Sequence, residues 1–435
     1  MHKLTFIFCL LLHSAISWSQ APAKVAEVPP VEVHFSVEGG FYDQSLTLEL
    51  SATEGATIYY TTDGRAPVRK VRKYTKPIRI RTTMTIRAVA FLHKKRGVET
   101  GQTYFISEKR SQLATVALAV SPSKLFDPET GIFMEGKNVE DTTIYKRNAN
   151  FWDKSETTVH CQIFERDGRI VHNGKMGMRL FGGFSRAFPQ KSLALIARES
   201  YGDTRIRYPL FGKKGKKKYK YLVLRNAGSD FGKAHYRDAL MSELTRKWDL
   251  ERQDYRPAQV YINGEYWGIY NMREKVNRHF IAQHHDVDKD SIDLMEHQLV
   301  ERHGTKLHYE QMLGFMDKYS LAKQHNFAYV ESMMDVRNFM DYQIAQIYCD
   351  NQDAGGNIKY WRPQHEGGRW RWILYDTDWG FGLHDDDAYK NNSLKFHTED
   401  DGPKWPNPPW STFILRNLLE NVAFQRQFVN RFMDD

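Results

Sequence analysis

The sequence predicts an α+β domain with two lobes, preceded by a small all-β antiparallel sandwich. Residues 31–106 consist of short runs in which apolar and polar residues alternate, which is the period of a half-buried strand. Strand-like runs continue to residue 272, whereas residues 277–350 show mainly helical spacing. Strands that come first and helices that follow give an α+β layout, with an acidic stretch at the junction of the two lobes.

Composition places the chain among globular proteins. It has 435 residues, of which 41% are hydrophobic and 26% are charged, so it is long enough for two or three domains with a sizeable core. No stretch after the N-terminal apolar run is long and apolar enough for a transmembrane helix. Nothing in the sequence resembles a nucleic-acid-binding module, so nucleic acid is not an expected partner.

The N-terminus has the pattern of a secretory signal peptide. A positive start is followed by an apolar run from Leu4 to Leu12 and then by small residues. We therefore expect residues 1–19 to be a signal peptide that is cleaved after Ser19, and residues 20–30 to be a linker. The mature protein is expected to be secreted, or to reside in the periplasm or cell envelope.

Charge and cysteine content leave alternatives open. The formal net charge is +9, and part of it is concentrated in the run Lys213–Lys220. Such a run is typical of a solvated loop, and the alternative is a dock for an acidic partner. After cleavage the cysteines are Cys161 and Cys349, which either form a disulfide or remain two buried thiols. Neither has the spacing of a metal site.

Residues 31–108 are similar to a known accessory module. The motif Gly55-Ala-Thr-Ile-Tyr-Tyr-Thr-Thr-Asp-Gly64 combines a strand with a turn. Together with Pro67, Tyr74, Pro77-Ile78 and Thr85-Ile-Arg-Ala88 it resembles the immunoglobulin-like module at the C-terminus of chitobiases. Tyr59 and Tyr60 alternate across the strand, so one of them is expected in the core. The other is open to contact with a polysaccharide or the cell envelope.

A glycine loop lies between two strand-like runs of the larger domain. Gly182 and Gly183 would let backbone amides approach an anion, and Arg186 and Lys191 add positive charge beside them. This arrangement is that of the strand-rich lobe of a kinase, but alone it is a weak signal, because an ordinary Gly-Gly hairpin with a neighbouring lysine is common. Glu243, in a helical pattern over residues 236–248, is a candidate partner for Lys191 or a solvated carboxylate.

A predicted helix leads directly into the acidic stretch, and a predicted hairpin lies earlier in the chain. Asp335 is a good N-cap for the helical pattern of residues 335–348. Helical spacing assigns six of its residues to the core: Val336, Phe339, Met340, Ile344, Ile347 and Tyr348. Asn263-Gly264 between two alternating runs predicts a tight β-hairpin.

Two acidic clusters lie about twenty residues apart. Asp353 and Asn357 enclose a short glycine-containing loop, and Asp376-Thr-Asp378 follows an apolar strand. Phosphoryl transfer requires one carboxylate to orient a hydroxyl, and a second carboxylate with an amide to hold a metal ion. An ordinary turn explains Asp353 and Asn357 by themselves, and Asp376-Thr-Asp378 alone fits a Ca²⁺ loop or a glycosidase carboxylate almost as well.

Residues 109–435 resemble the CotH family of spore-coat-type atypical protein kinases. The resemblance is ordered along the whole domain and is carried by these stretches: Asp127–Ile132, Gly182–Ser192, Leu224–Asn226, Arg237-Asp238, Tyr261–Tyr270 with Glu274, Asn351–Asp353 with Asn357, and Asp376–Asp378. It implies a two-lobed, kinase-like fold that uses ATP with Mg²⁺ or Mn²⁺.

The resemblance also implies roles for individual residues. Asp353 is expected to be catalytic. Asp376, Asn357 and, more weakly, Asp378 are expected to bind the metal. Five further residues are expected to contact the nucleotide: Gly182, Gly183, Arg186, Lys191 and Glu274.

Two departures from the family pattern are visible. The loop from Asp353 to Asn357 is one residue shorter than usual, which puts the reach of Asn357 to the metal in doubt. The chain also stops at Asp435, directly after a helical pattern, where the helical lobe of the family often continues. One expectation is therefore that the C-terminal part of the domain is incomplete in this sequence.

Three functions remain from the sequence. The first is an exported kinase that phosphorylates Ser or Thr of exported or envelope proteins. The second is an envelope or adhesion protein that retains the fold without catalysis, because fold alone does not determine function. The third, a carbohydrate-active enzyme, would need two carboxylates that face each other across a sugar.

Overall fold

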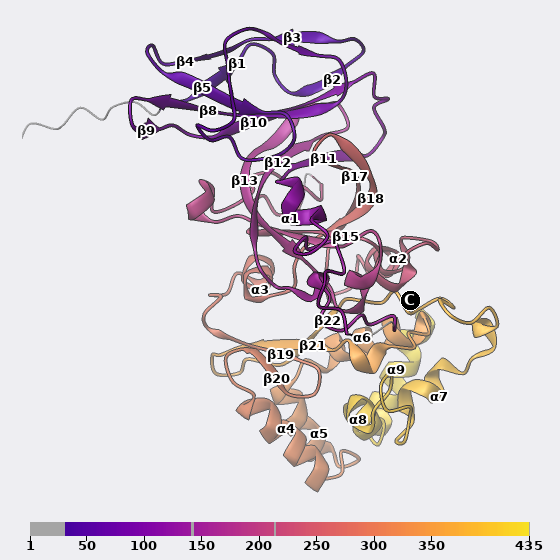
Figure 1. Ribbon diagram of the computed structural model, residues 1–435. Helices are drawn as coiled ribbons and strands as arrows, with labels where there is room; N and C mark the ends of the chain where they lie inside the picture. Colours follow the sequence, from indigo (N-terminus) through magenta and orange to yellow (C-terminus); the bar gives the residue numbers. More distant parts are fainter. Residues whose placement is uncertain (1–30, 141–142, 213–214, 435) are drawn as a thin grey trace, which may run out of the picture.

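A computed structural model describes residues 31–140, 143–212 and 215–434. Three parts follow one another along the molecule (Figure 1): a β-sandwich, a closed β-barrel and a C-terminal half of mixed sheet and helix. This content, with an all-β N-terminal part, confirms the predicted α+β class. The expected signal peptide and linker lie outside the described residues. Within the described part, no helix combines the length and apolar character needed to cross a bilayer.

The sandwich follows the alternating pattern of the sequence. In β5 (Thr57–Thr61), Ile58 and Tyr60 are buried, whereas Tyr59 is half-buried and packs edge-on against Phe91, with 5.7 Å between the ring centroids. The core position expected for one tyrosine is therefore that of Tyr60. The main sheet has the order β2-β10-β8-β5-β6 with β9 on β8, and β1-β4 and β3-β7 form two small sheets. The other strands are β1 (Val33–Phe35), β2 (Gly40–Tyr42), β3 (Leu46–Leu48), β4 (Leu50–Ala52), β6 (Arg72–Lys73), β7 (Ile78–Ile80), β8 (Met84–Leu92), β9 (Lys95–Arg96) and β10 (Thr100–Ile106).

Seven strands form the barrel, in the order β11-β12-β13-β14-β15-β18-β17. The barrel closes because β11 pairs in parallel with β17, whereas the other pairs are antiparallel. The predicted hairpin at Asn263-Gly264 is confirmed, and both residues have the positive φ (55° and 90°) that this tight turn requires. The strands are β11 (Ala114–Ala119), β12 (Thr157–Phe164), β13 (Ile170–Leu180), β14 (Leu193–Ile196), β15 (Tyr221–Arg225), β17 (Tyr255–Ile262) and β18 (Glu265–Arg273).

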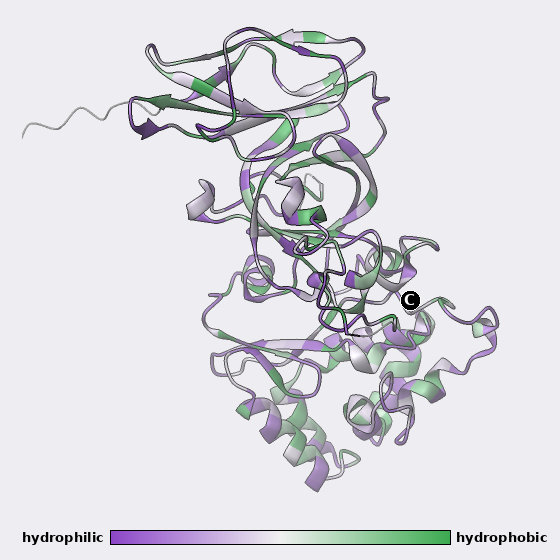
Figure 2. Cartoon of the chain, viewed as in Figure 1, coloured by the Kyte–Doolittle hydropathy of each residue, from purple (hydrophilic) through white to green (hydrophobic). Residues whose placement is uncertain are grey.

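The C-terminal half contains a five-stranded sheet, ordered β16-β22-β21-β19-β20, with helices packed around it (Figure 1). Helices α4 and α5 carry both hydrophobic and hydrophilic stretches (Figure 2), as expected for helices with one face in a core. The strands are β16 (Glu251–Arg252), β19 (Ile292–Glu296), β20 (Val300–His303), β21 (Lys359–Pro363) and β22 (Arg371–Leu374). The helices are α1 (Pro122–Phe126), which precedes this half, α2 (Arg237–Leu244), α3 (Arg278–His285), α4 (Leu307–Lys318), α5 (Gln324–Met333), α6 (Val336–Tyr348), α7 (Ser393–Thr398), α8 (Pro409–Leu418) and α9 (Val422–Asp434).

Helix α6 is the central helix of this half. Its predicted N-cap is confirmed, because the side chain of Asp335 accepts a hydrogen bond from the backbone N–H of Asn338 at 3.1 Å. Five of the six predicted core residues are buried. The prediction for Tyr348 is wrong, since this residue is 63% exposed. It is the last residue of the helix, where the chain leaves the packed face and turns toward Asp353.

Two open questions of the sequence have structural answers. Cys161 and Cys349 are both buried and both free, so the alternative of two buried thiols is confirmed. In the lysine run, residues 213 and 214 lie outside the described part. Lys217 and Lys218 are exposed, in keeping with a solvated loop.

The sandwich packs directly on the barrel. Phe105 from the sandwich meets Tyr261 of β17 (4.8 Å between ring centroids) and Phe164 of β12 (5.4 Å), and all three are buried. Gln162 of β12 accepts a hydrogen bond from the backbone N–H of Thr103 at 2.6 Å. Apolar contact and buried hydrogen bonds together hold the sandwich in one orientation on the barrel.

His160 is buried in this interface. Its Nε2 lies 3.1 Å from the carbonyl oxygen of Gly101 and 2.7 Å from Oδ1 of Asn173, while Nδ1 is buried without a partner. Two acceptors around Nε2 require the neutral ring to carry its proton there. Burial, with the charge of Arg87 as a second cause, lowers the pKa of His160 to about 4.

We predict that stability falls as the pH drops from about 6.5 to about 4. The unfolded chain takes up a proton on His160 near the ordinary pKa of 6.5, whereas the folded chain resists it down to about 4. This site contributes at most about 3 kcal/mol to the loss. Urea unfolding of the wild type and of His160→Gln at pH 7.5, 5.5 and 4.5 measures the effect.

The His160→Gln variant should be less stable than the wild type at pH 7.5 and should lose less stability on acidification. His397 is a second fully buried histidine, whose pKa burial lowers to about 4, so part of the slope should persist in the variant. An identical slope in wild type and variant would show that His160 is not the group responsible.

Candidate active site

A cleft of about 1360 Å³ lies between the barrel and the C-terminal half. Four of its lining residues are the acidic-stretch residues that the sequence singled out: Asp353, Asn357, Asp376 and Asp378. Gly182, Gly183 and Arg186 line it from the barrel. The structure therefore brings together seven of the nine predicted site residues, although they are separated by almost 200 positions in the chain.

Asp353 lies just beyond α6, where the chain turns into the short 3-10 helix η5 (Ala354–Gly356). It is only 6% exposed. Its Oδ2 accepts a hydrogen bond from Nδ2 of Asn357 at 2.7 Å, and its Oδ1 is buried without a hydrogen-bond partner. Burial, followed by the charge of Asp376, raises the pKa of Asp353 to about 7. The residue thus presents one unused acceptor oxygen at the cleft.

The glycines after Asp353 are required by a close approach of the backbone. A Cβ at Gly355 would lie 2.6 Å from the carbonyl oxygen of Pro406, which no side chain could tolerate. The backbone N–H of Gly355 donates to that same carbonyl at 2.8 Å. The short loop is therefore fixed by the segment that carries Trp405, and Asn357 faces Asp353.

The second acidic cluster follows the end of β22. Asp376 has a left-handed backbone (φ 58°), which Asp tolerates better than most residues. Thr377 donates to Oδ1 of Asp238 through its backbone N–H (3.1 Å) and its hydroxyl (3.2 Å). Oδ2 of Asp378 accepts from the backbone N–H of Ser229 at 2.5 Å. The three residues are thus held against the barrel and against α2.

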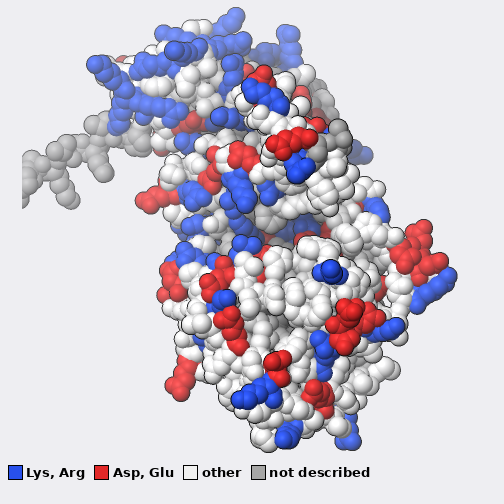
Figure 3. Space-filling view, turned by 60° about the horizontal axis from the view of Figure 1, so that its bottom comes forward, with Lys and Arg blue, Asp and Glu red and all other residues white. Residues whose placement is uncertain are grey.

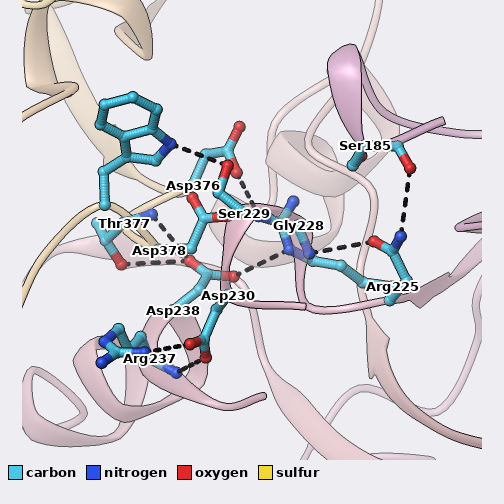
Figure 4. Close-up of polar contacts among 12 residues, drawn as sticks. Ser185, Arg225, Gly228, Ser229, Asp230, Arg237, Asp238, Asp376, Thr377 and Asp378 are labelled. Atoms are coloured by element: carbon cyan, nitrogen blue, oxygen red, sulfur yellow. Dashed lines mark hydrogen bonds and ion pairs between the residues drawn. The ribbon is translucent and has the colours of Figure 1, made fainter. Parts of the chain in front are cut away.

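Arg225, at the end of β15, is the counter-charge of this cluster (Figure 4). Its guanidinium hydrogen-bonds Asp376, lies 3.3 Å from Asp378 and 3.7 Å from Asp238. Burial alone would lower the pKa of Arg225, and the three carboxylates together raise it. Asp238 also pairs with the buried Arg273 at 2.6 Å. One arginine is therefore shared by three acids in a place shielded from water.

The charge in the acidic cluster exceeds what Arg225 compensates. Burial, followed by the charge of Asp376, raises the pKa of Asp378 to about 7, against the opposing charge of Arg225. The pKa of Asp353 is raised by the same two causes. The buried carboxyls of Asp353 and Asp378 therefore share Asp376 as a negative neighbour. Within the described residues, no three His, Cys, Asp or Glu side chains form a ready-made metal cage.

A hard divalent cation nevertheless fits these residues. The donors are the carboxylate oxygens of Asp376 and Asp378 and the amide oxygen of Asn357, which all line the cleft. Mg²⁺ is commonly bound through one or two carboxylates together with water and substrate phosphates, and so needs few protein ligands.

Two predicted nucleotide contacts do not line the cleft. Lys191 is 3% exposed, and its Nζ donates to the carbonyl oxygens of Arg186 (2.7 Å) and Phe188 (3.1 Å). The ammonium also lies 4.3 Å from the ring centroid of Phe151. Burial lowers the pKa of Lys191 to about 8. Lys191 therefore ties down the segment after the glycine loop and does not face the cleft, unlike the position expected from the sequence.

Glu274 and Glu243 also have structural partners. Glu274 is buried outside the cleft lining and accepts hydrogen bonds from His284 (2.8 Å) and from the backbone N–H of Asp254 (3.1 Å). Glu243 is exposed and pairs with Arg246 at 2.9 Å. The suggestion that Glu243 pairs with Lys191 is wrong, because Lys191 is engaged by carbonyl oxygens, and the alternative of a solvated carboxylate is confirmed.

The cleft is rich in positive charge. It has four acidic lining residues, namely Glu296 and the three aspartates, and nine basic ones: Lys154, Arg179, Arg186, Arg225, Arg273, Lys275, Arg278, Arg302 and Lys359. Several are neutralised by carboxylates, as Lys359 is by Glu296 at 3.0 Å. In the described part of the chain Arg179 and Lys275 make neither an ion pair nor a side-chain hydrogen bond. These two cations remain available to an anion.

Sequence reasoning missed Arg179, Arg225 and Lys275 as site residues. Arg225 carried one usable signal, because a charge that ends the apolar strand Tyr221-Leu-Val-Leu-Arg225 needs a partner. Arg179 and Lys275 gave no such signal. Whether a strand residue faces a cleft depends on the closure of the barrel, and that closure results from the parallel pairing of β11 with β17.

Two family models match the chain. The model described as CotH kinase protein matches residues 178–435, which is more than half of the chain. The model described as chitobiase/beta-hexosaminidase C-terminal domain matches residues 37–100, within the sandwich. A comparison with curated proteins finds no match. Both resemblances noted in the sequence are thereby confirmed.

We predict that Arg225→Met lowers the free energy of unfolding by about 3–5 kcal/mol, because it leaves buried carboxylates without their counter-charge. Added Mg²⁺ should restore part of the loss by replacing the missing positive charge. Urea unfolding with EDTA and with 10 mM MgCl₂ measures both effects.

The matched control is Arg246→Met. Arg246 also pairs with an acid, but 65% of its side chain is exposed, so its loss should cost less than about 1 kcal/mol. Equal destabilisation by the two substitutions would contradict the role of Arg225 as a shared counter-charge.

Proposed function

This chain belongs to the CotH kinase protein family, and we propose that it is an exported kinase that transfers the γ-phosphate of ATP to Ser or Thr of exported or envelope proteins. One observation carries the proposal. The free Oδ1 of Asp353 and the Asp376–Asp378 cluster meet in one cleft, opposite barrel residues with uncompensated positive charge. A hydroxyl acceptor, a metal-bound phosphate and a polyanion site are the three requirements of phosphoryl transfer.

Asp353 is the residue proposed to orient the acceptor. The Ser or Thr hydroxyl donates its hydrogen bond to Oδ1, because Oδ2 is engaged by Asn357. As the acceptor oxygen forms its bond to the γ-phosphorus, the bond from that phosphorus to the β,γ-bridging oxygen breaks and ADP leaves. The proton of the hydroxyl passes to Asp353. The hydrogen bond from Asn357 holds the carboxylate in the required orientation.

Asp376, Asp378 and the side-chain carbonyl of Asn357 are the proposed holders of Mg²⁺ or Mn²⁺. The ion would supply positive charge to the β- and γ-phosphate oxygens. Arg225 keeps Asp376 and Asp378 on one side of the cleft before the ion binds. Ser229, through its backbone N–H on Asp378, limits the movement of that side chain.

Arg179 and Lys275 are proposed to bind the phosphates in place of Lys191. Arg179 lies on β13 and Lys275 follows β18, so both are positioned by strands of the barrel. Lys275 is half-buried, with its ammonium 4.8 Å from the ring centroid of Tyr221, and burial lowers its pKa to about 8. A phosphate beside Lys275 would favour its charged form. Gly182 and Gly183 line the same side of the cleft, where backbone amides can approach the anion.

An envelope protein without catalysis is the second candidate. The observation in its favour is that Arg225 already hydrogen-bonds Asp376, the principal expected metal ligand. Such a protein would keep the acidic cluster as a structural ion-pair network and would show no nucleotide-dependent change.

Incubation of the mature protein with labelled ATP, Mg²⁺ or Mn²⁺ and a Ser-rich acceptor tests the proposal. We predict label transfer by the wild type and a loss of at least about 100-fold in Asp353→Ala and Asp376→Ala. Wild-type protein that neither transfers label nor shows an ATP-dependent thermal shift would refute the kinase function and favour the second candidate. Transfer that survives both substitutions would refute the residue assignment.

Measuring the ATP affinity of the same variants separates nucleotide binding from phosphoryl transfer. Asp353→Ala should keep its ATP affinity, whereas Arg179→Gln and Lys275→Gln should each weaken ATP binding by about 10- to 100-fold, since charge-assisted hydrogen bonds to phosphate are lost. Lys191→Met should change the affinity by less than about 3-fold, as should the exposed control Lys218→Gln. A large loss in Lys191→Met alone would return the phosphate contact to Lys191.

A further inference from the structure

One stretch of the sandwich, residues 65–96, is strongly basic. Between residues 65 and 96 there are twelve Lys and Arg and no Asp or Glu. The net charge of the whole chain is +9, so the remainder of the chain has a formal charge of −3. Figure 3 shows Lys and Arg side chains gathered over the sandwich at the top of the view. The stretch holds twelve basic residues, whereas the lysine run 213–220 holds six.

Seven of these residues form one continuous surface, which we call the basic edge. Its members are Arg69, Lys70, Arg72, Lys73, Lys94, Lys95 and Arg96, and all seven are exposed. Contacts across the surface join the loop before β6 to the β8–β9 hairpin. Arg69 donates to the carbonyl of His93 and lies 4.2 Å from the Phe91 ring centroid, and Arg96 donates to the carbonyl of Pro67 at 3.4 Å.

The charge of the basic edge is largely uncompensated. Arg96 pairs with Glu99 at 3.0 Å, and Glu99 is already engaged by the buried Arg87. The other six residues make no ion pair within the described part of the chain. Like charges at this density repel one another, so an anionic partner is favoured here by the sum of their fields.

The shape of the basic edge favours a flat partner. It consists of a loop and a hairpin tip, and neither of the two described cavities includes a sandwich residue. Two apolar side chains are exposed beside the charges: Val68 (44%) and Val98 (53%). No described aromatic residue of the sandwich is among the exposed large apolar residues, so nucleic-acid bases lack a stacking surface.

The start of the described chain adjoins the same edge. The backbone N–H of Val98 donates to the carbonyl of Val31 at 3.0 Å, which places residue 31 beside the β9 end. The described chain therefore enters the fold next to the basic edge.

From these observations we propose that the basic edge docks on the surface of a lipid bilayer that contains anionic headgroups. Each Lys or Arg near such a surface raises the partition coefficient by about 5-fold. Val68 and Val98 would insert at the headgroup boundary. Because the sandwich is fixed on the barrel, and the cleft lies at the opposite end of the barrel, docking would present the cleft away from the bilayer (Figure 1).

Vesicle co-sedimentation of the full chain tests the docking. The probes are vesicles of 30% phosphatidylglycerol in phosphatidylcholine and vesicles of pure phosphatidylcholine, at 50 and 500 mM NaCl. The edge variant replaces Lys70, Lys73, Lys94 and Lys95 by Gln. The matched control replaces four exposed lysines elsewhere by Gln: Lys217, Lys218, Lys247 and Lys323. The wild type and both variants begin at the same residue, so any contribution from the N-terminus is common to them.

We expect binding to the anionic vesicles that weakens with salt, and a loss of at least about 50-fold in the edge variant but of less than about 5-fold in the control. Equal losses in the two variants would overturn the proposal, as would equal binding to neutral vesicles. Binding to soluble polygalacturonate without binding to vesicles would also overturn it in favour of an acidic polysaccharide. Thermal melting at equal temperatures for all three proteins confirms that the comparison concerns folded chains.

Discussion

The sharing of Arg225 among three carboxylates, two of them buried, is the interaction on which the rest of the site depends. Asp376 and Asp378 belong to the C-terminal half, Asp238 belongs to α2, and Arg225 belongs to the barrel. Each of these charges would be costly in the interior without the others. The ion-pair cluster therefore fixes the two sides of the cleft against each other at the point where the chemistry is proposed.

The same cluster explains why the surrounding backbone has its form. The chain turns at Asp376, which has a positive φ, and this turn directs the backbone N–H of Thr377 to the carboxylate of Asp238. At Gly228, also with a positive φ (63°), a Cβ would overlap Asp378 Oδ2 and the Arg225 guanidinium, so glycine is required there. Local strain and tight packing are thus concentrated around the carboxylates, as is common where a protein must hold charged groups in one arrangement.

Much of this could be predicted from the sequence, and the reasons for the rest are physical. Local signals sufficed for the Asn263-Gly264 hairpin and for helix α6 with its Asp335 cap. The convergence of Asp353 with Asp376 was expected from motif order. The position of Lys191 was not, because the motif does not show which way the side chain turns, and its ammonium donates to carbonyls of its own loop. Tyr348 has the helical spacing of a core residue, but it is exposed because it ends helix α6. The basic edge was overlooked because its residues are scattered over loops and strand ends.

The central claim is that Asp353 and Asp376 face a metal-bound nucleotide across one cleft. A crystal structure of the protein with Mn²⁺ and a non-hydrolysable ATP analogue tests it most directly, because Mn²⁺ gives an anomalous signal. We expect an anomalous peak within about 2.3 Å of an Asp376 oxygen, the phosphates beside Arg179 and Lys275, and the γ-phosphate facing Asp353 Oδ1. A nucleotide bound outside this cleft, or a metal peak that is not coordinated by Asp376, would contradict the account.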